Sequence, residues 1–252
     1  MKLQFAAWPE VEEYLTTNAG IIVPIGSTEQ HGPTGLMGTD YIIPSAMAKA
    51  ISERTGICST PPVTFGMAQH HLGFPGTISL RPSTYVSVLV DVMQSLARHG
   101  FRRIVFLNGH GGNIAPALTA MNEFYAGTSF HLEGEHRDVL CKLISWWMPP
   151  KTAAEITEIF GDGDGAHATA SEIAVTQFLH SKYIKQASPD LPQARKGTVS
   201  DIHNAYDYRH RFADGRIGSD VRLCSPESGQ RVFEVATREI ADECAAFFSA
   251  KG

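Results

Sequence analysis

Two short runs of hydrophobic residues, each followed at once by a polar, glycine-containing segment, constrain the fold of this chain more than any other feature. Residues 20–25 read Gly-Ile-Ile-Val-Pro-Ile, and residues 103–107 read Arg-Ile-Val-Phe-Leu. Neither run alternates hydrophobic with polar residues, as a strand with one face in water would. Strands that are hydrophobic on both faces are typical of a parallel sheet covered by helices on both sides. We therefore expect an α/β fold in which both runs are buried strands.

Longer segments with helical spacing separate these predicted strands. Helices are predicted at residues 42–54, 84–99, 114–124, 152–160, 168–179 and 227–248. Weaker strands are predicted at 59–64, which two prolines confine to an edge or an end, and at 129–132. Residues 186–230 are rich in Pro, Gly, Asp and Arg and show little periodicity. Because no linker composition interrupts the chain, residues 1–252 are predicted to form a single domain.

Composition and charge limit the classes of protein to which this chain can belong. Hydrophobic residues make up 43% and charged residues 19%, which is typical of a globular protein and not of a disordered one. The 21 Lys and Arg against 26 Asp and Glu disfavour nucleic acid as a partner, since phosphate binding needs a basic surface. No hydrophobic run approaches the ~20 residues that cross a bilayer. With no secretory signal and no paired cysteines, we expect a soluble, cytoplasmic protein that acts on a small molecule and has no membrane contact.

The first polar cluster follows the strand at 20–25. Residues 26–33 read Gly-Ser-Thr-Glu-Gln-His-Gly-Pro, and Asp40 follows after a glycine-bearing loop. In extended backbone the side chains of Glu29 and His31 leave the same side, with Cα atoms roughly 6.5 Å apart. That separation suits ligands of two adjacent metal ions, or of one ion if the backbone bends. The alternative is a polar turn in which Asp40 caps the next helix.

The second polar cluster follows the strand at 103–107. Residues 108–113 read Asn-Gly-His-Gly-Gly-Asn, with His110 at the crest of a predicted turn. The glycines let the backbone turn sharply and approach a ligand, and Asn113 or a neighbour can cap the helix that follows. The segment matches neither a dinucleotide-binding nor a phosphate-loop motif. A plain glycine-rich turn is the alternative, although a histidine between glycines favours a ligand.

The third polar cluster covers residues 162–172 and includes His167 and Glu172. Its acidic, glycine-rich start lacks the regular spacing of a calcium-binding loop. For Glu172 alone, capping of the following helix is the default interpretation. Taken together, the three clusters offer carboxylates and imidazoles without thiolates, a ligand set that suits zinc, manganese or iron(II). A carboxylate that bridges two such ions, roughly 3.5–4 Å apart, would let them activate a water molecule.

These motifs resemble the creatininase (creatinine amidohydrolase) family. The matching segments are residues 26–33, 38–40, 74–80 and 108–113, with a weaker match at His167-Ala168 and Glu172. The resemblance implies a three-layer α/β/α sandwich with a mostly parallel central sheet. It also implies a homohexamer with a two-metal site. The segment 34–37 and the residues around Glu172 depart from the usual family pattern, which affects the substrate pocket.

The resemblance implies two sets of metal ligands that share Asp40. One ion would be held by Glu29, Asp40 and His110, and the other by His31, Asp40 and Glu172. In creatininase itself a glutamate two residues after the histidine of the glycine turn binds the second ion. That position is Gly112 here, so Glu172 is the predicted replacement. The expected cofactors are two divalent ions, Zn²⁺ first, with Mn²⁺ and Fe²⁺ as alternatives.

The leading functional hypothesis is a metal-dependent amidohydrolase that cleaves a C–N bond in a small amide, cyclic amide or formamide. The backbone amides of Gly111 and Gly112 are predicted to stabilise the developing oxyanion. His167 is predicted to protonate the leaving nitrogen, because histidine titrates in a useful range. Two alternatives remain open. The same site would hydrolyse a cyclic ketone or a small peptide in cofactor maturation, or the chain would be a non-catalytic binding or structural subunit.

Three further groups receive no catalytic role from the sequence. The pair His70-His71 precedes the segment 74–80, so it would face the pocket or, as paired histidines in loops often are, be simply solvated. Residues 146–148, Trp-Trp-Met, suggest core packing, a subunit contact or a lid over the substrate. The segment 203–210 is interpreted as a polar, aromatic surface loop.

Overall fold

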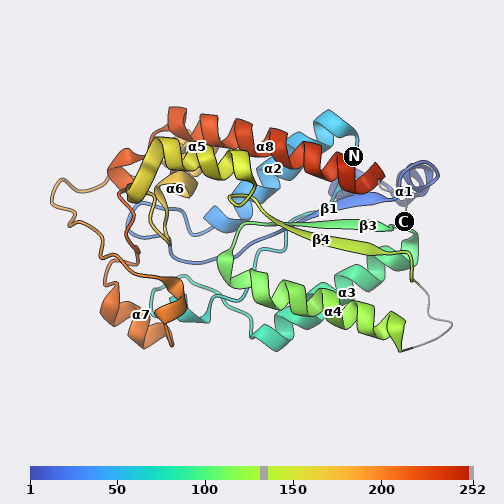
Figure 1. The fold of residues 1–252 in the computed structure, drawn as a ribbon, viewed down its shortest axis with the longest axis horizontal. Coiled ribbons are helices and arrows are strands. Elements are labelled where there is room, and N and C mark those ends of the chain that lie inside the picture. The colour runs from blue at the N-terminus through green and yellow to red at the C-terminus, as the bar shows by residue number, and fades with distance from the viewer. Residues whose placement is uncertain (131–135, 250–252) are drawn as a thin grey trace.

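Four parallel strands form the middle layer of the protein, and helices cover both of its faces (Figure 1). The computed structural model describes residues 1–130 and 136–249. The strands are β1 (Gly20–Ile25), β2 (Cys58–Ser59), β3 (Arg103–Asn108) and β4 (Leu140–Ser145), in the order β2-β1-β3-β4. This three-layer arrangement with a parallel sheet confirms the predicted fold class.

The two faces of the sheet bury different sets of helices. One face packs against α2 (Thr39–Thr55), α5 (Pro150–Phe160), α6 (Ala170–Leu179) and α8 (Pro226–Ser249). The other packs against α3 (Pro82–His99) and α4 (Ile114–Ser129), with α1 (Trp8–Leu15) beside them. Along β1, Ile22 belongs to the first hydrophobic cluster and Ile21 to the second, because successive side chains of a strand point to opposite faces. Burial on both faces explains why β1 contains no polar residue.

The chain reverses its winding direction between β1 and β3. From β1 it passes through α2 to β2, and from β3 it passes through α4 to β4, on the opposite face and toward the opposite edge. The carboxyl ends of β1 and β3 therefore flank a topological switch point, where open α/β sheets bind their ligands. The polar clusters at 26–33 and 108–113 both begin there.

The sequence predicted the central strands and most helices correctly and the sheet edges poorly. The predicted strand at 59–64 is only two residues long as β2, because Pro61 and Pro62 lack the N–H groups that a ladder needs. The predicted strand at 129–132 is wrong at its start, since Ser129 ends α4; residues 131–132 lie outside the described part. The unpredicted β4 is an edge strand with half-exposed residues. Helices α1 and α7 (Ala205–Arg211) were also missed.

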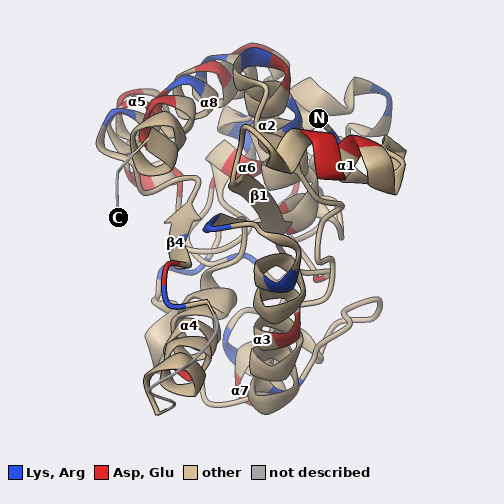
Figure 2. Ribbon diagram, turned by 90° about the vertical axis from the view of Figure 1, so that its right-hand side faces the viewer, with Lys and Arg blue, Asp and Glu red and all other residues tan. Residues whose placement is uncertain are grey.

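The outer faces of the helices carry charges of both signs, as Figure 2 shows for α5 and α8. Arg231 of α8 lies 2.7 Å from Glu155 and 3.0 Å from Glu158, both on α5. Such exposed pairs contribute little to the free energy of folding, about 0–1 kcal/mol each. None of the described helices is long and hydrophobic enough to span a membrane.

The start of α2 is packed unusually closely against the ends of β1 and β3. Pro44 lies inside α2 and has no N–H to donate to the carbonyl of Asp40, four residues before it. A Cβ atom at Gly26 or Gly109 would overlap that carbonyl oxygen. Only glycine at both positions lets the two strand ends reach the first turn of α2, which carries Asp40.

We expect Gly109→Ala to lower the free energy of unfolding by about 1–3 kcal/mol, because the new methyl group would displace α2 from the strand ends. Chemical denaturation of the purified protein measures this loss. Gly127→Ala, at an exposed position of α4 where an added Cβ meets nothing, is the control and should raise stability by about 0.5–1 kcal/mol. Equal stability of Gly109→Ala and the parent protein would contradict the close approach.

Candidate metal centre

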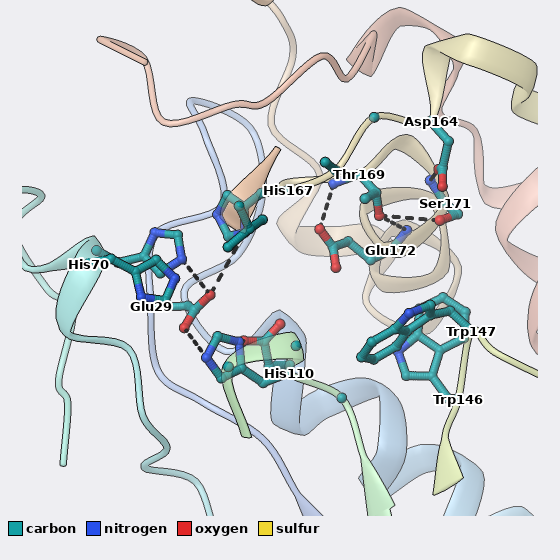
Figure 3. Close-up of a pocket in the computed structure, with 18 of the residues that line it drawn as sticks. Glu29, His70, His110, Trp146, Trp147, Asp164, His167, Thr169, Ser171 and Glu172 are labelled. Atoms are coloured by element: carbon teal, nitrogen blue, oxygen red, sulfur yellow. Dashed lines mark hydrogen bonds and ion pairs between the residues drawn. The ribbon is translucent and has the colours of Figure 1, made fainter. Parts of the chain in front are cut away.

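A cavity of about 660 Å³ lies at the carboxyl ends of β1 and β3. Figure 3 shows that side chains from segments far apart in the chain converge on it. They include the predicted site residues Glu29, Asp40, His110, Gly111, Gly112, His167 and Glu172. His31 lies directly behind this lining, against Asp40. The structure therefore brings together all eight residues that the sequence singled out.

The first predicted ligand set is assembled at one end of the cavity. His110 lies between two carboxylates: its Nδ1 is 3.1 Å from Asp40 Oδ2 and its Nε2 is 3.3 Å from Glu29 Oε2. One ligand atom from each of Glu29, Asp40 and His110 lies within 4.8 Å of the other two. That spacing is compatible with a shared ion after small side-chain adjustments.

The second predicted ligand set adjoins the first and shares Asp40 with it. His31 Nε2 is 2.9 Å from Asp40 Oδ1 and 3.9 Å from Glu172 Oε1. Ligand atoms of His31, Asp40 and Glu172 also lie within 4.8 Å of one another. The two carboxylate oxygens of Asp40 thus face one histidine from each set.

Unpartnered oxygen atoms support a cation at this site. Both carboxylate oxygens of Glu29 and Oδ2 of Asp40 are buried without a hydrogen-bond partner of good geometry among the described residues. A buried carboxylate without compensation is costly, and a bound cation supplies that compensation. The donor set of carboxylates and imidazoles, with no thiolate, fits zinc, manganese or iron(II).

Glu29 and Asp40 differ sharply in their electrostatic surroundings. Burial raises the pKa of Glu29 to about 8, with the charge of Asp40 adding to the effect and His110 opposing it. Burial also acts to raise the pKa of Asp40, but His31 and His110 outweigh it and hold the value well below its usual range. Asp40 is also in the first turn of α2, where the helix dipole favours a negative charge. Asp40 is therefore an anion in the metal-free protein.

The two histidines beside Asp40 have raised pKa values, in contrast to the lowered pKa of Asp40. Burial alone would lower the pKa of His31, but the carboxylates of Asp40 and Glu172 raise it to about 10. For His110, Glu29 and Asp40 likewise overcome burial and raise the pKa to about 9. In the metal-free protein both rings are positively charged at neutral pH. They therefore compensate the charge of the carboxylates, as bound cations would.

Two asparagines brace the loops that carry these ligands. Asn108 accepts from the backbone N–H of His110 at 3.0 Å and donates to its carbonyl at 2.8 Å. Asn113 donates to the carbonyl of Gly26 at 3.0 Å and accepts from the N–H of Met67 at 3.1 Å. Asn113 occupies the N-cap position of α4, but its side chain joins loops instead of capping the helix.

His167 and Glu172 approach the site from the segment before α6. His167 Nε2 lies 2.9 Å from the carbonyl of Gln30, and its Nδ1 lies 3.9 Å from Glu29 Oε1. Burial, with the nearby charge of His31, lowers the pKa of His167 well below its usual value, so the ring is neutral. Glu172 accepts from the N–H of Thr169 at 2.5 Å in a capping box. The default interpretation of Glu172 as a cap is confirmed, and the same side chain also faces His31. For Asp40 the capping alternative is wrong, because Gly38 is the N-cap of α2.

Several residues of the site have no catalytic role in the hypothesis drawn from the sequence. The pair His70-His71 is buried and lines the cavity, so of the two interpretations the one that faces it toward the pocket is confirmed and the solvated one is wrong. His71 Nε2 lies 3.2 Å from Glu29 Oε1. Burial lowers the pKa of His71 well below its usual value, so this ring is neutral as well. Their position before the motif at 74–80 was the available signal.

Tyr208 belongs to the segment 203–210, for which the sequence predicts a polar, aromatic surface loop. The structure differs: the segment contains α7, and Tyr208 is fully buried with its ring centroid 4.7 Å from that of His71. Trp146 and Trp147 line the cavity and pack on the core, while Met148 is exposed. The tryptophans thus form a wall of the site, which no sequence signal distinguished from core packing or a lid.

The comparisons with known proteins agree on one family. A family model described as creatininase, creatinine amidohydrolase, matches residues 4–244. Creatinine amidohydrolase of Pseudomonas putida is 29% identical over 251 residues, covering 93% of this chain and 92% of the relative. A mycofactocin precursor peptide peptidase of Mycobacterium ulcerans is 28% identical over 245 residues, covering 91% and 84%.

Solved structures agree with the sequence relatives. A mutant creatininase of the "Zn-Zn type" superposes with a TM-score of 0.82 at 25% identity, covering 99% of this chain and 98% of that one. A structure named "Creatininase Mn" superposes with a TM-score of 0.82 at 24% identity, covering 99% of each chain, and shows the shared fold.

The histidine pKa values predict that metal binding releases protons. A ligand imidazole must be neutral, so binding at pH 7 displaces protons from His31 and His110, whose pKa values are about 10 and about 9. We expect at least one proton released per chain and an apparent zinc affinity that rises between pH 7 and pH 9. Calorimetric titration in buffers of different ionisation enthalpy counts the protons. The exposed-histidine variant His99→Gln should behave like the parent protein; zinc binding without proton release would contradict the assignment.

Proposed function

Because the chain belongs to the creatininase family, we propose that residues 1–252 form one metal-dependent amidohydrolase domain that cleaves a C–N bond of a small amide, cyclic amide or formamide. The family and its relatives make the chain an enzyme of the hydrolase class. The observation that carries the finer proposal is the pair of adjoining ligand sets that share Asp40. A fold alone needs neither the buried charges nor their convergence.

Two divalent ions would supply Lewis-acid chemistry, lowering the pKa of a water and polarising the substrate carbonyl. Glu29, Asp40 and His110 would hold one ion, and His31, Asp40 and Glu172 the other. We propose zinc first and manganese second, since similar structures are named for both metals. Iron(II) remains a third candidate by the chemistry of the ligands.

The remaining roles belong to His167 and the glycine turn. His167 is neutral, and its Nδ1 faces Glu29 while its Nε2 is engaged by the carbonyl of Gln30. Nδ1 would take a proton from the attacking water and pass it to the leaving nitrogen as the C–N bond breaks. The backbone N–H groups of Gly111 and Gly112, which line the cavity, would stabilise the developing oxyanion.

A short peptide is the second candidate substrate, favoured by the size of the cavity. Its volume of about 660 Å³ is in the range that takes a drug-sized ligand, well above the volume of a single small ring. Trp146 and Trp147 give it an apolar wall, and Asp164 and Glu172 add polar side chains to the lining. The mycobacterial relative is named as a peptide peptidase. A homohexamer and a cytoplasmic location remain further predictions of the proposal, to be checked by light scattering and cell fractionation.

Removal of metal tests the proposal directly. We expect chelation to abolish turnover and zinc or manganese to restore it, because the bound ions activate the water. Asp40→Asn and His110→Gln should lose metal and activity together. The exposed-residue variants Asp91→Asn and His99→Gln, both on α3, serve as matched controls and should retain both. Elemental analysis beside activity assays makes the measurement, and a metal-free, fully active Asp40→Asn would refute the ligand assignment.

The bond that is cleaved can be identified with a substrate panel. Metal-replete protein should hydrolyse at least one member of a set of lactams, formamides, cyclic ketones and short peptides, with the products followed by mass spectrometry. Turnover of an amide supports the proposal, and turnover of a ketone alone contradicts it. About two ions per chain would be expected for the two-metal centre. Purified protein with no tightly bound metal and no turnover would favour the non-catalytic subunit.

A further inference from the structure

Gln30 separates the predicted ligands Glu29 and His31 in the chain, and its own side chain is buried, with 5% of its surface exposed. The amide nitrogen Nε2 lies 3.0 Å from Nδ1 of His71 and 2.9 Å from Nε2 of His167. Both rings line the cavity. A single neutral side chain therefore touches two of the imidazoles nearest Glu29, and the proposed function gives it no task.

Backbone groups fix which way the Gln30 amide faces. Its Oε1 accepts from the N–H of Gly32 at 2.8 Å, and its Nε2 donates to the carbonyl of Gly215 at 3.0 Å. A backbone N–H can only donate and a carbonyl can only accept, so a flipped amide would lose both bonds. The NH₂ group must therefore face the two histidines.

This orientation determines where His71 carries its proton. Since Gln30 Nε2 donates, Nδ1 of His71 accepts, and the proton of the neutral ring is on Nε2. That Nε2 lies 3.2 Å from Oε1 of Glu29. The second amide proton goes to Gly215, because Nε2 of His167 donates its own proton to the carbonyl of Gln30.

The segment without recognised motifs holds the amide in place. Tyr208 donates to the carbonyl of Gly215 at 2.8 Å, and its hydroxyl oxygen lies 3.3 Å from Gln30 Nε2. Gly215 has a φ of 87°, and a Cβ there would overlap Gln30 Oε1, so only glycine fits. A small hydrophobic cluster around Tyr208, formed by Phe74, Phe212 and Ile217, anchors this contact.

We propose that Gln30 is a positioning residue: its amide, held by Gly32, Gly215 and Tyr208, keeps His71 protonated on Nε2, so that the ring presents an N–H and not a lone pair to the Glu29 carboxylate that would bind a cation. The histidine tautomer follows from the contacts alone. Only the consequence for the cation rests on the proposed function. Groups behind the ligands commonly orient them in this way, and their loss typically weakens metal binding 10- to 100-fold.

The tautomer of His71 tests the role of Gln30 without reference to activity. Solid-state ¹⁵N spectra of histidine-labelled, metal-free protein distinguish the two tautomers, and His71→Gln identifies the His71 signals. We expect the proton on Nε2 in the parent protein. In the near-isosteric Gln30→Glu the carboxylate accepts instead of donating, so Nδ1 of His71 should become protonated. A parent protein with the proton on Nδ1, or an unchanged His71 in Gln30→Glu, would overturn the proposal.

Zinc affinity, measured by competition with a fluorescent chelator, tests the consequence. We expect Gln30→Leu to bind zinc about 10-fold more weakly or worse, and Tyr208→Phe to show a smaller loss in the same direction. Gln177→Leu, the same change at a half-buried position of α6, is the control and should bind within twofold of the parent. Affinity of Gln30→Leu within twofold of the parent would overturn the role in metal binding. A parent protein that binds no zinc would contradict the proposed function, while the tautomer still decides the role of Gln30.

Discussion

The carboxylate of Asp40, buried between two positively charged imidazoles, is the interaction on which the rest of the site depends. Its oxygens lie 2.9 Å from His31 and 3.1 Å from His110, which come from the loops after β1 and β3. A charge buried this deeply is tolerable only when it is paired, and the first turn of α2 adds the favourable end of a helix dipole. Asp40 therefore ties both loops to α2, and it is the residue that the two proposed ions would share.

The backbone of Asp40 is constrained as tightly as its side chain. Pro44 cannot donate to the Asp40 carbonyl, and Gly26 and Gly109 bring the strand ends against it. The reversal of winding between β1 and β3 makes room for α2 and α4 on opposite faces of the sheet. The same geometry that makes a crevice at the switch point thus brings the predicted ligands together in it.

Particular residues show how far the sequence could lead and where it failed. Glu29, His31 and His110 could be found because each directly follows a fully hydrophobic strand within a glycine-containing motif. For Glu172 the sequence predicts a helix cap and the family resemblance implies a ligand, but only the three-dimensional structure shows that the capping side chain is also a neighbour of His31. Tyr208 and Gly215 belong to a segment without periodicity, and they reach the site through Gln30, more than 170 positions earlier in the chain.

The sequence by itself determined the fold class, the two central strands and the chemical nature of the predicted ligands, because burial on both sheet faces and the glycine-containing turns leave local patterns. Only the tertiary structure decided which side chains share a cavity and what charge each carries. In the folded protein His71 is buried, Trp146 and Trp147 form a wall of the cavity, and the amide of Gln30 has a fixed orientation. These outcomes depend on contacts between distant segments and on desolvation, neither of which is encoded in the spacing of neighbouring residues.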